Sequence, residues 1–162
     1  DTATLKNLIS TSNEWFRGLG LPQQSQPTGL GAEYAFPDNV TNLSTIQLGT
    51  LQLQLTGYYT YTLKLLGKEE AELSAIQIVY NYKLGLAVNN EHHRPRDGRA
   101  PAREILEAVA ISKDNTLMSL QQNILARQLR VKHLETQAEI YKEHLAKLSR
   151  EQSRREIRGE TY

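Results

Sequence analysis

Apolar residues recur every seven positions along the last third of the chain. One series runs in steps of seven from Leu117 and a companion series runs from Leu120, and nine of the ten places in their first five heptads are apolar. Such a stripe is typical of a long helix packed against a partner helix. No Pro or Gly interrupts residues 114–158, so we expect one helix of about 44 residues, ~65 Å long. The seam comprises Leu117, Leu120, Ile124, Val131, Leu134, Ala138, Tyr141, Leu145 and Leu148.

A second long helix is predicted from residue 44 onward. Ser44 and Gln47 match a capping box, in which each side chain bonds the backbone N–H of the other residue. Two adjacent apolar rows follow and form a face broad enough for two neighbouring helices. The glycines of this stretch each weaken a helix by roughly 1 kcal/mol relative to Ala, and either close approach of a neighbour or local breaks account for them. The first row is Leu48, Leu51, Leu55, Tyr58, Thr62, Leu65, Ile76 and Val79, the second is Tyr59, Leu66, Leu73, Tyr80 and Ala87, and the glycines are Gly49, Gly57, Gly67 and Gly85.

The N-terminal 43 residues contain a short helix and a segment rich in helix breakers. Residues 1–17 have the apolar spacing of a short amphipathic helix, which Gly18 closes, with Trp15 and Phe16 as anchors. Residues 18–43 contain three prolines and four glycines, which predicts a Pro/Gly-rich tether. One interpretation is a flexible linker. The other is a strap whose apolar residues dock on a neighbouring subunit; these residues are Leu30, Tyr34 and Phe36.

A polar turn is predicted over residues 89–101, where Asn, Pro and Asp-Gly cluster. Residues 102–110 are helical in pattern again, and residues 112–115 offer a new N-cap, so the helix is either continuous or interrupted there. The predicted fold is therefore all-α. Residues 44–158 form a long antiparallel helical hairpin with coiled-coil-like packing. Because one hairpin cannot cover both apolar rows, we expect a homo-oligomer.

Composition agrees with a long seam better than with a globular core. Only 39% of the residues are hydrophobic, and the net charge is +1, with basic residues concentrated in the second half. The absence of Cys excludes disulfides, thiolate metal sites and cysteine nucleophiles. No apolar run reaches the ~20 residues of a membrane span, and no signal-peptide pattern is evident. We expect a soluble cytoplasmic protein with no membrane partner.

Candidate catalytic and metal-binding residues are few. His133 and His144 lie three helical turns apart, and the pair at 92–93 falls in the predicted turn, so the histidines do not converge as metal ligands do. Glu69, Glu70 and Glu72 stand among lysines, which favours surface pairing over carboxylate chemistry. No phosphate-binding Gly-rich loop or nucleophile elbow is present. The sequence predicts no enzyme, no catalytic residue, no metal and no cofactor.

Two groups of residues are candidates for binding nucleic acid. The first is four arginines in and after the predicted turn, namely Arg94, Arg96, Arg99 and Arg103. Arginines offer bidentate donors to phosphate, although a solvated loop explains them equally well. The second is Tyr61 with Lys64 and Lys68, since aromatic rings stack on unpaired bases. Tyr58, Tyr59 and Tyr61 cannot share one helix face, so we assign the first two to the core and expect Tyr61 to be exposed.

The order of parts resembles the UvsY-type recombination mediators of tailed phages. The resemblance lies in a long helix through residues 48–88 that contains the segment Ile78–Lys83, a polar turn, and a second long helix through residues 117–155. It implies a helical oligomer that binds single-stranded DNA, interacts with a single-strand-binding protein and helps to load a recombinase, in the cytoplasm of a host cell. The alternative is a structural or assembly protein of a phage particle, such as a small packaging subunit or a coiled-coil adaptor.

Overall fold

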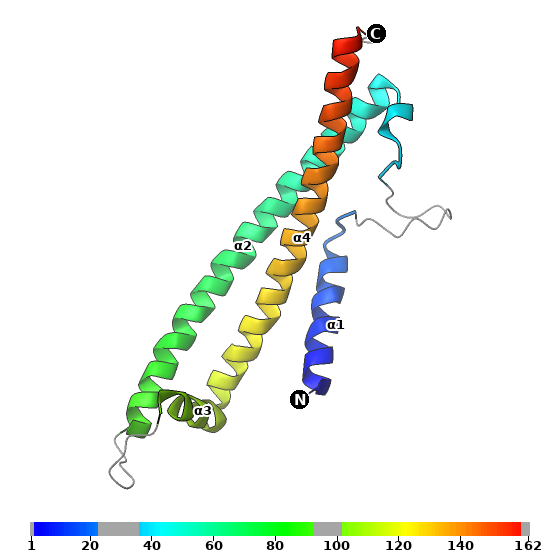
Figure 1. The fold of residues 1–162 in the computed structure, drawn as a ribbon. Coiled ribbons are helices and arrows are strands. Elements are labelled where there is room, and N and C mark those ends of the chain that lie inside the picture. Colours follow the sequence, from blue (N-terminus) through cyan, green and yellow to red (C-terminus); the bar gives the residue numbers. More distant parts are fainter. Residues whose placement is uncertain (1, 23–35, 93–101, 160–162) are drawn as a thin grey trace. The chain divides into compact units, whose positions relative to one another are not determined.

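A computed structural model describes residues 2–22, 36–92 and 102–159 of the chain. All regular structure within these residues is helical, so the predicted all-α class is confirmed (Figure 1). The elements are α1 (Thr2–Gly18), the short 3₁₀ helix η1 (Val40–Asn42), α2 (Thr45–His92), α3 (Arg103–Lys113) and α4 (Asn115–Arg158).

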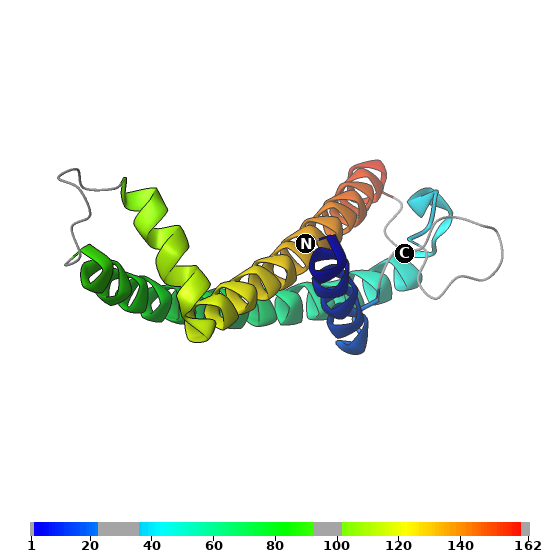
Figure 2. The ribbon, with the colours of Figure 1, turned by 90° about the horizontal axis from the view of Figure 1, so that it is seen from below.

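The chain folds into two compact parts. The first part comprises Asp1–Ser12 and Lys68–Arg130, and the second comprises Asn13–Gly67 and Val131–Tyr162. The long helices α2 and α4 each contribute one segment to both parts. In the first part, α3 links the end of α2 with the start of α4 (Figure 2).

The start of α4 shows how the sequence ends one helix and begins the next. Asp114 adopts an extended backbone with φ −114° and ψ 104°, and its N–H still donates to the carbonyl of Ala110 at 3.2 Å. Its carboxylate accepts from the backbone N–H groups of Thr116 at 2.7 Å and Leu117 at 3.4 Å. The helix is therefore interrupted at Asp114, and α4 has 44 residues.

The start of α2 follows the predicted capping box. The Ser44 N–H donates to Gln47 Oε1 at 2.9 Å, and the Gln47 N–H donates to Ser44 Oγ at 3.2 Å. The helix then continues to His92, so the predicted turn at 89–101 is wrong for its first four residues. Asn89 and Asn90 are exposed helical residues near the end of α2. Their low helix propensity costs too little to end the helix before them.

The interior of the second part consists of two apolar clusters. In one, Leu48 and Leu55 of α2 pack with Tyr141 and Leu148 of α4 and with Phe36, which precedes η1. The other joins the end of α1 to α4; its buried members are Phe16, Leu21 and Leu134, with Trp15, Leu19, Leu65 and Leu66 packed against them. The predicted anchors Trp15 and Phe16 therefore pack against their own chain.

The predicted tether is partly structured. Pro22 is fixed by its carbonyl, which accepts hydrogen bonds from Gln137 Nε2 at 3.1 Å and from the Tyr141 hydroxyl. Phe36 is 7% exposed and packs on its own chain rather than on a neighbouring subunit, because Leu48 and Tyr141 provide an apolar site for the ring. Residues 36–43 are therefore not a tether. Leu30 and Tyr34 lie outside the described residues.

In the first part, the one polar residue in the first five heptads of the α4 seam, Arg127, belongs to an ion-pair cluster. Arg127 Nη1 lies 2.9 Å from Glu69 Oε2 and also contacts Glu72 Oε2. The side chains of Arg127 and Glu69 are only 19% and 10% exposed. Glu72 also pairs with Lys68 one turn earlier. The expectation of surface pairing is therefore wrong for Glu69, which faces α4 instead of solvent.

The seam residues of α4 lie on its covered face. Five of the nine are buried and the other four are half-buried. The buried five are Leu117, Leu134, Ala138, Tyr141 and Leu148, and the half-buried four are Leu120, Ile124, Val131 and Leu145.

Candidate nucleic-acid interface

The predicted residues of α2 lie on the surface. Tyr61 is 47% exposed, and Lys64, one turn further on, is exposed and forms no ion pair among the described residues. Lys68 belongs to the first part and approaches Glu72 Oε1 at 3.9 Å. Of the tyrosines assigned to the core, Tyr59 is half-buried, whereas Tyr58 is 38% exposed and stacks on Tyr141 with ring centroids 6.2 Å apart. Tyr61 and Lys64 are therefore both accessible on α2, three residues apart.

The arginines of the predicted turn contribute one described residue. Arg103 opens α3 with a side chain that is 83% exposed, and its Nε donates to Glu107 Oε1 at 2.8 Å. Arg94, Arg96 and Arg99 lie outside the described residues. Arg103 therefore offers a phosphate only the donors that Glu107 leaves open.

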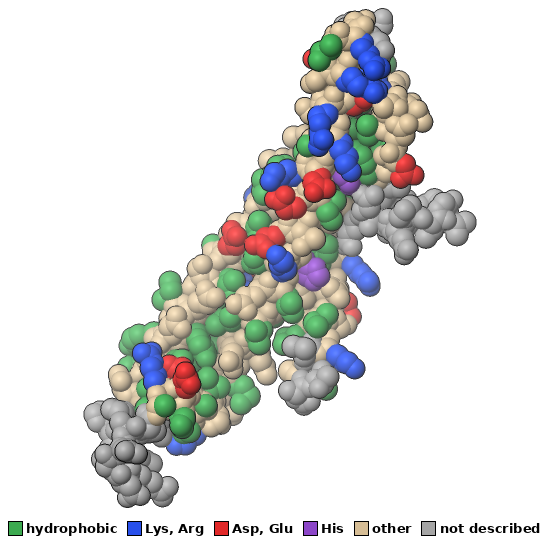
Figure 3. Space-filling view, viewed as in Figure 1, with side chains coloured by type: hydrophobic (Ala, Val, Ile, Leu, Met, Phe, Trp, Pro, Cys, Tyr) green, Lys and Arg blue, Asp and Glu red, His purple; other side chains and the backbone are tan. Residues whose placement is uncertain are grey.

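The last turns of α4 contain a cationic surface that is not among the predicted nucleic-acid-binding residues. Lys147, Arg150 and Arg154 are spaced at i, i+3 and i+7, so they lie on one side of the helix. Figure 3 shows Lys and Arg side chains gathered toward the C-terminal end of this helix. The helical spacing of these three cations is the sequence signal that identifies the surface.

These cations border a cavity of about 430 Å³ within the second part. Its other wall comes from the segment that precedes α2. The complete lining is Phe36, Pro37, Asp38, Val40, His144, Lys147, Arg150, Glu151 and Arg154. Lys147 Nζ lies 5.7 Å from the centroid of the Phe36 ring, and Arg150 Nε donates to the carbonyl of Ala146 at 3.2 Å. Within the described ranges, Lys147 and Arg150 form no ion pair with a carboxylate.

Two of the lining residues form an aromatic pair. The rings of Phe36 and His144 stack with centroids 3.9 Å apart and planes 16° apart. His144 is 6% exposed. Burial lowers the pKa of His144, and the positive charge of Lys147 lowers it further against the opposing effect of Glu143. Both burial and the charge of Lys147 therefore favour the neutral imidazole, and an anion placed beside it would favour the protonated form.

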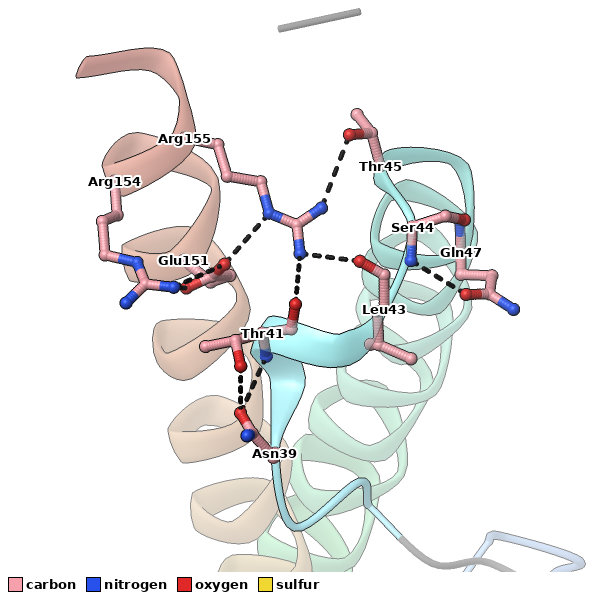
Figure 4. A network of polar contacts seen from close by, with 9 residues as sticks. All are labelled: Asn39, Thr41, Leu43, Ser44, Thr45, Gln47, Glu151, Arg154 and Arg155. Carbon is pink, nitrogen blue, oxygen red and sulfur yellow. Dashed lines mark hydrogen bonds and ion pairs between the residues drawn. The ribbon is translucent and has the colours of Figure 1, made fainter. Parts of the chain in front are cut away.

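Beside this cavity, Arg155 joins the end of α4 to the segment that precedes α2 (Figure 4). Its Nη2 donates to the carbonyls of Leu43 at 2.7 Å and Thr41 at 3.2 Å, and its Nε donates to Glu151 Oε1 at 3.0 Å. Arg154 Nη2 lies 2.9 Å from Glu151 Oε2. Burial acts to raise the pKa of Glu151, but hydrogen bonds from Arg155 and Arg154 outweigh it and hold that pKa below its usual value. The cavity is thus pre-formed, with its one buried carboxylate already neutralised.

In the described residues, no three His, Asp or Glu side chains are placed to hold a metal ion, and none of the helices is long and apolar enough to cross a membrane. No family model, curated protein or solved structure matches the chain.

Proposed function

We propose that this chain forms a homo-oligomeric helical hairpin that binds single-stranded DNA and acts as a recombination mediator, helping a recombinase to load in the presence of a single-strand-binding protein. The observation that carries DNA binding is the pair of cations Lys147 and Arg150, which lie on the cavity without a carboxylate partner in the described residues. The mediator role and its protein partners come from the resemblance to UvsY-type proteins.

Phosphate contacts explain why such a surface suits a single strand of any sequence. Lys and Arg side chains that neutralise phosphates bind the backbone without reading bases. Tyr61, which is 47% exposed on α2 beside Lys64, adds a ring on which an unpaired base can stack. Together these groups support sequence-tolerant binding.

Oligomerisation is supported by apolar side chains that the chain leaves exposed on α2. Ile78 and Tyr82, one turn apart, are 70% and 69% exposed. The glycines of α2 do not serve close packing within the chain, because a Cβ atom added at any of the four would meet nothing within 4 Å. A second subunit lying along this helix would account for both features.

Fluorescence anisotropy with a labelled, unstructured oligonucleotide tests the proposal. We expect binding at low salt that weakens as salt rises, by ~0.7 in log–log slope for each phosphate contact. Replacing Arg94, Arg96 and Arg99 by Ala should lower that slope if the turn contributes. Tyr61→Ala should instead weaken binding by about 1–3 kcal/mol per stacked base with little change in slope. Absence of binding at low salt contradicts the proposal.

The second candidate function is a helical assembly protein of a phage particle. The exposed apolar residues of α2 favour it, since they suit a protein partner as well as a second copy. In that case the oligomer would form while oligonucleotide binding was absent, and a mass measurement made beside the binding assay separates the two functions.

A further inference from the structure

The cavity at the end of α4 has the composition of a site for a compact anion. Four cations lie on or beside it: Lys147, Arg150, Arg154 and Arg155. Two carboxylates oppose them, and Glu151 is the one that Arg154 and Arg155 already neutralise. The other is the exposed Asp38. A net positive charge thus remains for a ligand.

The apolar wall strengthens the attraction between these cations and an anion. The ring of Phe36 is 7% exposed and lies below Lys147 Nζ at 5.7 Å, and Val40 lines the same side. Charges that act beside low-dielectric walls interact more strongly than in open water. The Arg155 contacts to residues 41 and 43 hold this wall against α4, so binding requires little ordering of the chain.

We infer that this cavity is a phosphate-binding site and that its ligand is a backbone phosphate of single-stranded DNA held by Lys147, Arg150 and the free edge of Arg154. This inference rests on the proposed function for the source of the phosphate. A guanidinium presents planar donors to two phosphate oxygens, and a lysine adds a point charge. Asp38, at the rim, opposes binding.

The phosphate site is tested first with inorganic phosphate, independently of DNA. The C2 proton of His144, assigned with a His144→Gln variant, is titrated by NMR with phosphate or with chloride at equal ionic strength. An anion beside Lys147 stabilises the imidazolium, so the apparent pKa of His144 should rise with phosphate only. The rise should be absent in a Lys147→Gln/Arg150→Gln variant. No rise, or an equal rise with chloride, would overturn the inference.

The DNA arm uses a short labelled oligothymidylate. Loss of two phosphate contacts should lower the salt slope of the Lys147→Gln/Arg150→Gln variant by about 1.4 and weaken binding on the order of tenfold at low salt. Asp38→Asn should strengthen binding. The matched control is Lys132→Gln/Lys142→Gln, which removes two exposed charges of α4 outside the cavity and should leave the slope unchanged.

The outcomes separate the two proposals. If the wild-type chain does not bind oligothymidylate, the proposed function fails, and the phosphate titration alone decides the anion site. If the wild-type chain binds and the Lys147→Gln/Arg150→Gln slope equals that of the wild type, the function stands and the cavity is not its phosphate site. Equal displacement by a polyglutamate peptide would overturn the assignment to nucleic acid.

Discussion

At the scale of single residues, the ion-pair cluster around Arg127 is the clearest departure from a simple apolar seam. Glu69→Ala leaves the half-buried guanidinium with only Glu72, and we expect a loss of about 1–3 kcal/mol of unfolding free energy. Arg127 Nε is also buried without a hydrogen-bond partner among the described residues. The double change Glu69→Leu/Arg127→Leu should therefore be close to neutral, as measured by urea unfolding.

An exposed ion pair provides the control for the Glu69 and Arg127 variants. Lys132 and Glu135 lie 3.2 Å apart with side chains 76% and 44% exposed, so Lys132→Ala should cost no more than ~0.5 kcal/mol. A double variant that is as unstable as Glu69→Ala would show that the cluster stabilises the fold outright. The sequence places Arg127 on the seam, but it does not identify the carboxylate that compensates its charge. Nothing in the sequence distinguishes Glu69, Glu70 and Glu72 as partners.

At the scale of the helix, Asp114 links stability to pH. Its pKa is lowered from an ordinary 3.8, chiefly by the hydrogen bond from the Thr116 backbone. A lowered pKa in the folded state means that the stabilisation is present above the unfolded value and is lost as pH falls through the folded value. Asp114→Ala should thus lower the thermal midpoint at neutral pH and have little effect in strong acid, as followed by circular dichroism.

The Asn variant isolates the charge from the cap. Asp114→Asn keeps a side-chain acceptor for the helix N-terminus but cannot titrate, so its difference from wild type should appear only above the folded pKa. Ser112→Ala, which changes an exposed hydroxyl bonded to Val109 one turn earlier, should follow the wild type at each pH. A pH-independent loss in Asp114→Ala would assign the effect to the cap alone.

Leu134 gives a second prediction for α4. It is fully buried against Phe16 and Leu21, so Leu134→Asp places a charge where the chain itself leaves no water. We expect a loss of several kcal/mol and extensive unfolding, measured by circular dichroism and urea titration. Lys132→Asp, on the exposed side of the same helix, should be almost silent. A folded Leu134→Asp protein with wild-type stability would contradict the packing of α1 on α4.

The same helices show what a sequence can predict. Local chemistry was sufficient for the length of α4 and for the capping box of α2, because helix ends depend on residues within a few positions. The surface on which the Phe36 ring packs could not be predicted in this way. Its partners Tyr141 and His144 are distant in sequence, and nothing near residue 36 distinguishes docking on its own chain from docking on another. The cationic cavity depends on that docking and was missed with it.

At the scale of the whole molecule, we expect several chains to assemble through α2. Ile78 and Tyr82 are 70% and 69% exposed on α2, and leaving such apolar area in water disfavours a lone chain. We expect light scattering at micromolar concentration to show a mass well above 18.4 kDa. Ile78→Asp/Tyr82→Asp should reduce that mass, since it puts charge into the proposed subunit contact.

The control for assembly is a matched double change on an exposed polar part of α4. Glu139→Gln/Lys142→Gln removes an exposed pair and should leave the mass unchanged. Helicity should be retained in both variants, because residues 78 and 82 contribute little to the interior of their own chain. A clean monomer for the wild type would contradict the oligomer, and the exposed apolar face of α2 would then require a different protein partner. An unchanged mass in Ile78→Asp/Tyr82→Asp would place the contact on another face.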